Sequence, residues 1–139
     1  MLTLNRRACE EMLRVDVHGC TDVTGFGLLG HARELAAASG VTVELATDRV
    51  QFLPGAIEYA RRGAIPGGLK NNREFVSCAV ANELDLAPEI EDLLYDPQTS
   101  GGLLISLSES DAAELERALP EAYRIGRVVE RRDKAIRLI

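Results

Sequence analysis

The hydrophobic positions along the chain follow two different periods. Apolar residues that recur every three or four positions predict six helices, and short alternating or unbroken apolar runs predict about five strands. Thr3 is placed to cap the first helix. The predicted helices span 3–14, 28–39, 54–62, 74–84, 88–94 and 111–119. The predicted strands span 15–20, 41–45, 103–107, 123–129 and 135–139.

Residues at the ends of these elements define the predicted connections. Gly40 is placed to end the second helix, and Ser108 or Ser110 is placed to cap the last one. The polar, glycine-containing segment 65–72 is predicted as a loop, and 131–134 as the turn of a hairpin between the last two strands. No internal repeat interrupts the pattern. The sequence therefore predicts a single α+β domain over residues 1–139, with helices packed on one sheet.

Composition narrows the class of protein. With 139 residues, 46% of them hydrophobic and 27% charged, the chain can form a globular core. The net charge of −6 and an aromatic content of 4% argue against a nucleic-acid partner. Cys9, Cys20 and Cys78 lack a Cys-x-x-Cys spacing, so no zinc site or disulfide framework is predicted, and a reducing cytoplasm is expected. No apolar run reaches membrane-spanning length, so no membrane partner is expected.

The stretch 21–31 combines groups that favour an anion and a cation in the same place. It joins a predicted strand to a predicted helix and reads Thr21-Asp22-Val23-Thr24-Gly25-Phe26-Gly27-Leu28-Leu29-Gly30-His31. Glycines let backbone N–H groups approach a ligand, and the N-terminus of a helix attracts phosphate. A carboxylate beside phosphates most often binds Mg²⁺, which prefers oxygen ligands. The stretch therefore fits a phosphate and metal site built around Asp22.

Other interpretations of 21–31 remain open. Gly25, Gly27 and Gly30 match the spacing G-x-G-x-x-G, but the acidic residue expected about 20 positions later in a dinucleotide-binding unit is not convincing. No Gly-Lys-Ser/Thr follows, which excludes a Walker A loop. A tight strand-to-helix turn with Asp22 or Thr24 as N-cap explains the same residues. The chemistry of the stretch does not decide between this turn and a phosphate–metal site.

A second loop has a similar character. Residues 96–102 read Asp96-Pro97-Gln98-Thr99-Ser100-Gly101-Gly102 and run into the apolar strand 103–107, which is expected to be buried on both faces. A plain turn that leads into this strand explains the segment without any ligand. If this loop and 21–30 lie at the same edge of the sheet, the two can cooperate in one site.

The remaining candidate groups have simple structural explanations. His18 and His31 are too few and wrongly spaced for a zinc site. The His31 side chain could point back toward the Gly27 loop, but a histidine on the helix surface is the simpler interpretation. Cys20 has no base beside it in the sequence, and a buried, inert thiol is the simpler interpretation. A solvated loop is likewise the simpler interpretation of Lys70, Asn71 and Asn72, which could otherwise contact an anion. No nucleophile–base pair is evident, so no catalytic residue is assigned.

The motifs at 21–31 and 96–104 together resemble the two signatures in the C-terminal half of the selenophosphate synthetases (selenide, water dikinases). Residues 1–6, 53–56 and 66–68 also fit that family in order. Either motif alone is also similar to related enzymes such as aminoimidazole ribonucleotide synthetase and thiamine-monophosphate kinase. The resemblance extends over essentially the whole chain.

The resemblance implies a fold and a reaction. The fold is that of the aminoimidazole ribonucleotide synthetase C-terminal domain, an α+β arrangement of α/β/α layers with a mixed sheet that is partly ferredoxin-like. The reaction converts ATP, selenide and water into selenophosphate, AMP and phosphate, with Mg²⁺ as cofactor. ATP and most of the metal are implied to bind an N-terminal domain that these 139 residues do not contain. The parent protein is implied to be a homodimer.

The resemblance also implies roles for particular residues. Asp22 matches a Mg²⁺ ligand of the family, which agrees with its position in a phosphate-binding pattern. Thr21, Thr24, Gly25 and Gly27 are expected to line the phosphate side of the cleft. The chain alone is expected to be inactive and to depend on the N-terminal domain of its parent. The alternatives are a non-catalytic binding or assembly domain, and the C-terminal domain of another ATP-dependent enzyme of the superfamily, such as thiamine-monophosphate kinase.

Overall fold

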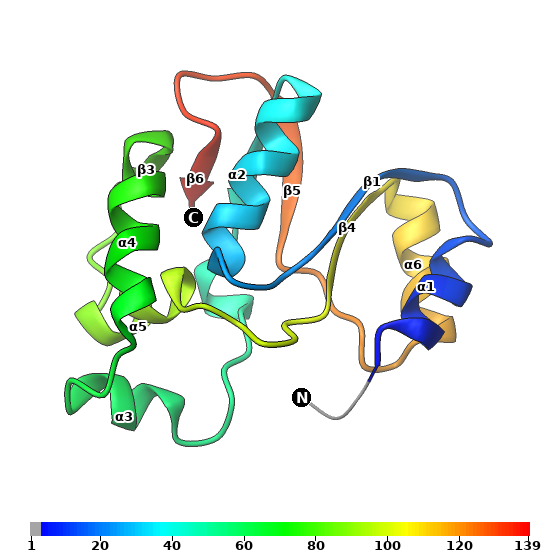
Figure 1. The fold of residues 1–139 in the computed structure, drawn as a ribbon. Coiled ribbons are helices and arrows are strands. Elements are labelled where there is room, and N and C mark those ends of the chain that lie inside the picture. The colour runs from blue at the N-terminus through cyan, green and yellow to red at the C-terminus, as the bar shows by residue number, and fades with distance from the viewer. Residues whose placement is uncertain (1–3) are drawn as a thin grey trace.

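The computed structural model describes residues 4–139, so the predicted helix cap at Thr3 lies outside the described residues. Helices and mixed sheets confirm the predicted α+β class (Figure 1). The helices are α1 (Arg6–Met12), α2 (Gly27–Ser39), α3 (Ala56–Arg61), α4 (Gly67–Val76), α5 (Pro88–Tyr95) and α6 (Glu109–Ala118), with 3₁₀ turns η1 (Thr47–Arg49) and η2 (Ser77–Ala79). The strands are β1 (Val17–Asp22), β2 (Val41–Leu45), β3 (Val80–Asn82), β4 (Leu103–Leu107), β5 (Gly126–Glu130) and β6 (Ile136–Leu138). No helix within residues 4–139 is both long and apolar enough to cross a bilayer.

The larger sheet has four strands in the order β3-β6-β2-β5. Strand β6 runs parallel to β2 and β3, whereas β5 runs antiparallel to β2. Helix α2 packs on β2 and β6 through the fully buried side chains of Leu29, Ala32 and Ala36. Two small alanines on this stripe let the helix lie close to Val43 and Ile136 in the same core. This packing fixes α2, whose first residues, 27–31, belong to the 21–31 motif.

The predicted hairpin at 131–134 is wrong. Strand β2 lies between β5 and β6, so the last two strands do not pair with each other. Their connection crosses β2, where the Arg132 N–H donates to Thr42 Oγ1 at 2.9 Å and that hydroxyl donates to the Lys134 carbonyl at 2.6 Å. Local alternation predicted the strands correctly, but it does not say which strand pairs with which.

The predictions for 65–72 and 74–84 are also wrong. Helix α4 begins at Gly67 in the segment predicted as a loop, and the chain leaves helix after Val76 to form η2 and the additional strand β3. Leu69, Asn72 and Val76 form the buried stripe of α4. Asn72 is polar, and two glycines precede it in the first turn, so the apolar period was hidden.

One predicted sheet is in fact two. Strands β1 and β4 form a separate antiparallel pair, which extends from the larger sheet toward α1 and α6 (Figure 1). The residues of β4 are half-buried, not buried on both faces as predicted. Asp22 at the end of β1 pairs with Leu103 at the start of β4. This register brings the segments that adjoin these two residues to the same edge.

Candidate functional site

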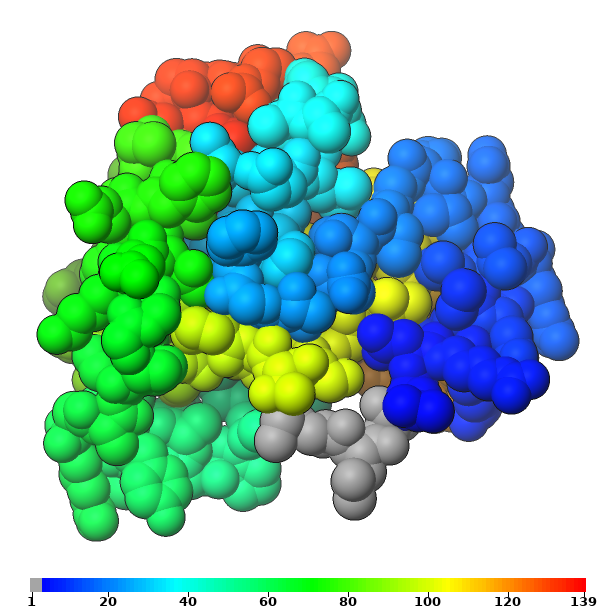
Figure 2. Space-filling model, in the orientation of Figure 1, coloured from blue at the N-terminus to red at the C-terminus, as the bar shows by residue number. Residues whose placement is uncertain are grey.

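The loops 21–30 and 96–102, called the two motif loops below, lie side by side and are hydrogen-bonded to each other. Val23 N–H donates to the Gly102 carbonyl at 3.0 Å, and Gly101 N–H donates back to the Val23 carbonyl at 2.9 Å. Gln98 N–H donates to the Thr24 carbonyl at 2.9 Å. Figure 2 shows these segments as adjoining blue and yellow surfaces on one face of the molecule. The condition for cooperation between the two loops, that both lie at the same edge, is therefore met.

Two glycines allow this close approach. Gly27 has φ +70°, and a Cβ added there would lie 2.8 Å from the carbonyl carbon and oxygen of Tyr95 and 2.9 Å from the Asp96 carbonyl oxygen. A Cβ added to Gly101 would lie 2.9 Å from the carbonyl oxygen of Val23. Real Cβ atoms do not approach backbone atoms this closely, so the two loops touch through glycine.

Asp22 lies exposed at the rim of the paired loops. Thr21 Oγ1 donates to the Asp22 carbonyl oxygen at 3.1 Å, which leaves the carboxylate outside that bond. Gly25 and Phe26 are also exposed and stand just before α2, and their N–H groups donate to no acceptor within residues 4–139. An exposed carboxylate next to free N–H groups at a helix N-terminus fits the simultaneous binding of a cation and an anion.

The donor set supports a partial metal site. Within residues 4–139, no group of three or more His, Cys, Asp or Glu side chains is placed to hold a metal ion. Mg²⁺ is usually bound through one or two carboxylates, with phosphate and water oxygens completing the octahedron. The single carboxylate of Asp22 fits one position of such a shared octahedron.

Thr24 and His31 form a pair inside the motif. Thr24 Oγ1 lies 3.1 Å from His31 Nε2, so the histidine does point back toward the loop. The His31 ring also packs on Phe26, with ring centroids 5.6 Å apart. Phe26 is the N-cap of α2, and no side chain caps that helix. The interpretation of Asp22 or Thr24 as N-cap is therefore wrong.

Asn72 belongs to the site, and the sequence interpretation missed it. Its side-chain amide donates to the Gly25 carbonyl at 2.9 Å and to the Tyr95 carbonyl at 3.0 Å, so it contacts the first loop and the residue just before the second. It is buried, which corrects its interpretation as part of a solvated loop. Its spacing from Leu69 and Val76, three and four positions away, was the signal that could have placed it on a buried helix face.

Two titratable groups in or beside the loops, Asp96 and Cys20, have raised pKa values. Burial raises the pKa of the Asp96 carboxyl, although Gln98 Nε2 donates to it at 3.0 Å and favours its charged form. Burial also raises the pKa of the Cys20 thiol, and the nearby Cys9 and Asp22 raise it further. A thiol with a raised pKa is a weak nucleophile, which agrees with the interpretation of Cys20 as inert, although the residue is half-buried and not buried as predicted.

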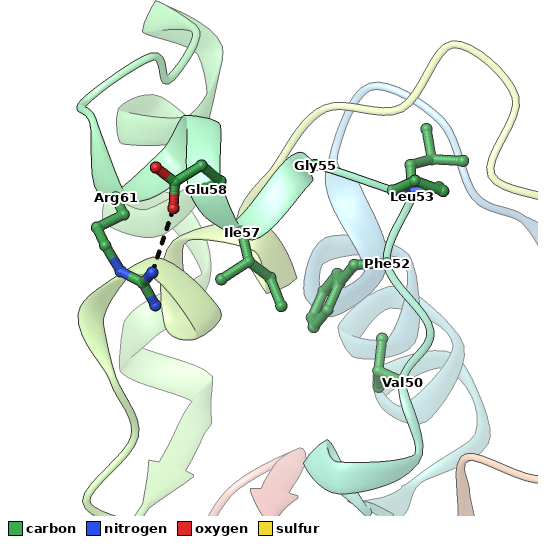
Figure 3. A pocket seen from close by; sticks show the side chains of 8 residues that line it. Val50, Phe52, Leu53, Gly55, Ile57, Glu58 and Arg61 are labelled. Carbon is green, nitrogen blue, oxygen red and sulfur yellow. Dashed lines mark hydrogen bonds and ion pairs between the residues drawn. The ribbon is translucent and has the colours of Figure 1, made fainter.

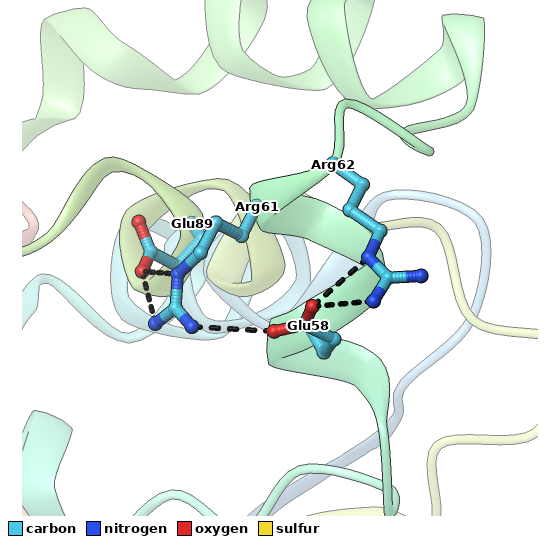
Figure 4. A network of polar contacts seen from close by, with 4 residues as sticks. All are labelled: Glu58, Arg61, Arg62 and Glu89. Carbon is cyan, nitrogen blue, oxygen red and sulfur yellow. Dashed lines mark hydrogen bonds and ion pairs between the residues drawn. The ribbon is translucent and has the colours of Figure 1, made fainter.

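A separate groove of about 500 Å³ is lined by residues of the segment 50–61 (Figure 3). None of its lining residues comes from either motif loop. Its walls are mainly apolar side chains, such as Val50, Phe52 and Ile57. Its charged groups are already paired. Arg61 bonds Glu89 at 2.7 Å and Glu58 at 3.3 Å, and Glu58 also bonds Arg62 (Figure 4). This groove therefore offers no free charge for the chemistry expected at the loops.

The whole chain matches known proteins. A family model described as AIR synthase related protein, C-terminal domain, matches residues 1–139. Similar proteins named selenide, water dikinase include one from Caldanaerobacter subterraneus subsp. tengcongensis, 47% identical over 138 residues, which covers 96% of this chain and 40% of that protein. Another, from Clostridioides difficile strain 630, is 43% identical over 144 residues and covers 100% of this chain and 41% of that protein.

A third relative with the same name, from Clostridium botulinum strain Eklund 17B, is 44% identical over 140 residues, which covers 98% of this chain and 41% of that protein. The chain thus spans well under half the length of these relatives. The resemblance inferred from the two motifs is confirmed.

Proposed function

Because the chain belongs to the family of AIR synthase related protein C-terminal domains, we propose that it serves as the C-terminal domain of a selenide, water dikinase. In the full-length protein it closes one side of a cleft where ATP, selenide and water give selenophosphate, AMP and phosphate. The observation that carries this proposal is the pairing of the two motif loops, with Asp22 exposed at their rim.

Each group of the first loop has a defined task in this proposal. The Asp22 carboxylate binds one Mg²⁺ ion, which neutralises charge on the phosphate oxygens when it is bound. The backbone at Gly25 and Phe26 lines the phosphate side, where their free N–H groups can bind an anion. Gly27, which the sequence placed on the same side, is buried and its N–H donates to the Thr24 carbonyl at 3.0 Å, so its part is to shape the turn. The hydroxyls of Thr21 and Thr24 lie on the same stretch, and His31 holds the Thr24 hydroxyl in place.

The chain depends on a partner for activity. Phosphoryl transfer needs several positioned charges on the phosphate oxygens, and one carboxylate with two glycine loops does not supply them. The partner in this proposal is the N-terminal, ATP-binding domain of the parent protein. The full-length parent protein forms a homodimer in this proposal. A reducing, cytoplasmic location is consistent with the free thiols of Cys9, Cys20 and Cys78.

The test is the Asp22→Asn variant of a full-length protein in which this chain supplies the C-terminal domain. Removing the charge should lower Mg²⁺-dependent ATP turnover by about 100-fold, because a metal ligand is weakened while the side-chain size is kept. Turnover and selenophosphate are followed by ³¹P NMR under anaerobic conditions with ATP, Mg²⁺ and selenide. Asp85→Asn, which removes an exposed carboxylate outside both loops, is the matched control. Equal turnover in the two variants rejects the role of Asp22.

A further inference from the structure

Helix α4 braces both motif loops at once. Asn72 lies on its buried face, is 7% exposed, and donates one hydrogen bond to Gly25 at 2.9 Å and one to Tyr95 at 3.0 Å. Gly25 belongs to the loop that carries Asp22, and Tyr95 is the last residue before the 96–102 loop. A single buried side chain therefore links the first loop to the residue just before the second.

The chemistry of this tie suits a side-chain amide. Both acceptors are backbone carbonyl oxygens, so the side chain has to offer two protons from one atom. The amide nitrogen of Asn72 does so, and the same requirement fixes which end of the amide faces the carbonyls. A serine or threonine hydroxyl has one proton, and an aspartate carboxylate has none and would repel both oxygens.

The same face of α4 also lies close to the second loop at Gly68. Gly68 lies one helical turn before Asn72, and a Cβ added there would lie 3.0 Å from Pro97 Cγ in the second loop. Arg73, next to Asn72, places its guanidinium 4.8 Å from the centroid of the Tyr95 ring. Helix α4 thus lies against the second loop at Pro97 and against Tyr95 just before it, while Asn72 also bonds the first loop at Gly25.

We propose that Asn72 is a positioning residue for the Mg²⁺ and phosphate site. It fixes the backbone at Gly25 against the second loop, and so holds the Asp22 carboxylate and the free N–H groups of Gly25 and Phe26 in one arrangement. Without the tie, that arrangement has to be imposed by the ligand, which lowers the affinity for the metal. The inference rests on the proposed function, because it assigns Asn72 to the same site.

The experiment uses Asn72→Ala and Asn72→Asp in a full-length protein that carries this domain. The measurement is the Mg²⁺ concentration that gives half-maximal ATP turnover, because this concentration does not depend on how much of the protein is folded. It should rise about 10-fold in Asn72→Ala and further in Asn72→Asp, while the turnover at saturating Mg²⁺ is largely kept. Asn71→Ala and Asn71→Asp make the same changes at the exposed neighbour and should leave it unchanged.

A second readout reports the tie without any ligand. Amide hydrogen exchange at Gln98 and Gly101, whose N–H groups bond the first loop, should accelerate about tenfold in Asn72→Ala. If Asn72→Asp does not fold, Asn72→Ala adds no charge and decides the question alone. An unchanged Mg²⁺ requirement in the Asn72 variants, together with lost turnover in Asp22→Asn, overturns the role of Asn72 alone. Unchanged turnover in Asp22→Asn rejects instead the proposed metal role of Asp22, on which this inference rests.

Discussion

Replacing Gly27 with alanine tests how closely the two motif loops touch. The added methyl group meets two obstacles. It forces a residue with a Cβ into φ +70°, and it places that Cβ 2.8 Å from the Tyr95 carbonyl group, which is backbone and has little room to shift. Gly40 offers a matched control, because it has φ +65° but no atom within 4 Å of an added Cβ. The difference between the two variants isolates the contact between the loops.

The magnitude follows from these two terms. The left-handed backbone costs roughly 1–2 kcal/mol in either variant. Forcing a methyl group into a packed contact adds about 1–3 kcal/mol in Gly27→Ala alone. The loss is therefore roughly 2–5 kcal/mol for Gly27→Ala and roughly 1–2 kcal/mol for Gly40→Ala. A natural domain has about 5–15 kcal/mol of stability in total, so the first loss is a large part of it.

The assay is urea denaturation of both variants and of the unsubstituted chain, with unfolding monitored by far-UV circular dichroism. The free energy of unfolding in water and its dependence on urea are fitted together, so that a change in compactness is separated from a change in stability. Gly25→Ala serves as a reference, because an added Cβ there meets no atom within 4 Å and its φ lies outside the left-handed region. If Gly27→Ala and Gly40→Ala lose the same free energy within about 0.5 kcal/mol, the close approach of the loops is refuted.

Two further predictions concern the rest of the domain. Ser108→Ala should lower the free energy of unfolding by about 1 kcal/mol, since Ser108 Oγ caps α6 by accepting from Asp111 N–H at 3.2 Å; an unchanged urea midpoint would contradict this. The hydrogen bond from Arg127, 2.7 Å long, lowers the pKa of Glu44 below its ordinary 4.5. The unfolded chain then binds more protons than the folded one as pH falls from this value, so stability that is full above pH 4.5 should be lost as pH falls through the folded pKa. In Glu44→Gln, the free energy of unfolding from urea titrations should depend less steeply on pH between about pH 3 and pH 7. An equally steep dependence would show that the pair of Glu44 and Arg127 does not cause it.

Local signals predicted the elements whose ends carry their own chemistry. Gly40 ends α2 in the left-handed conformation, as the sequence indicated, and Ser108, one of the two serines that the sequence offered for that position, caps α6. Both rules depend on a few neighbouring atoms and need no knowledge of the rest of the fold. The adjacency of the two motif loops was predicted only as a condition, because it depends on β1 pairing with β4 across more than eighty residues.

The errors came from features that tertiary packing decides. Asn72 is polar and follows glycines, so its segment was predicted as a loop, yet two carbonyl acceptors make its burial favourable. The pairing of β5 with β6 was predicted from their nearness in sequence, yet β2 lies between them. The role of Asn72 at the site was missed for the same reason, since its two acceptors lie 47 and 23 residues away in the sequence.

The insertion of β2 between β5 and β6 has a consequence for how the domain is made. Thr42 in β2 bonds Lys134, 92 residues later, and β6 with its fully buried Ile136 is an inner strand of the sheet. Within this domain, the segment that carries Asp22 and α2 is therefore synthesised before β6, the strand that completes the core on which α2 packs. Contacts at such separations slow folding and leave apolar surface open to misassociation while the chain grows. Within this domain, the residues of the candidate site therefore precede by a long stretch of sequence the strand that completes the core on which α2 packs.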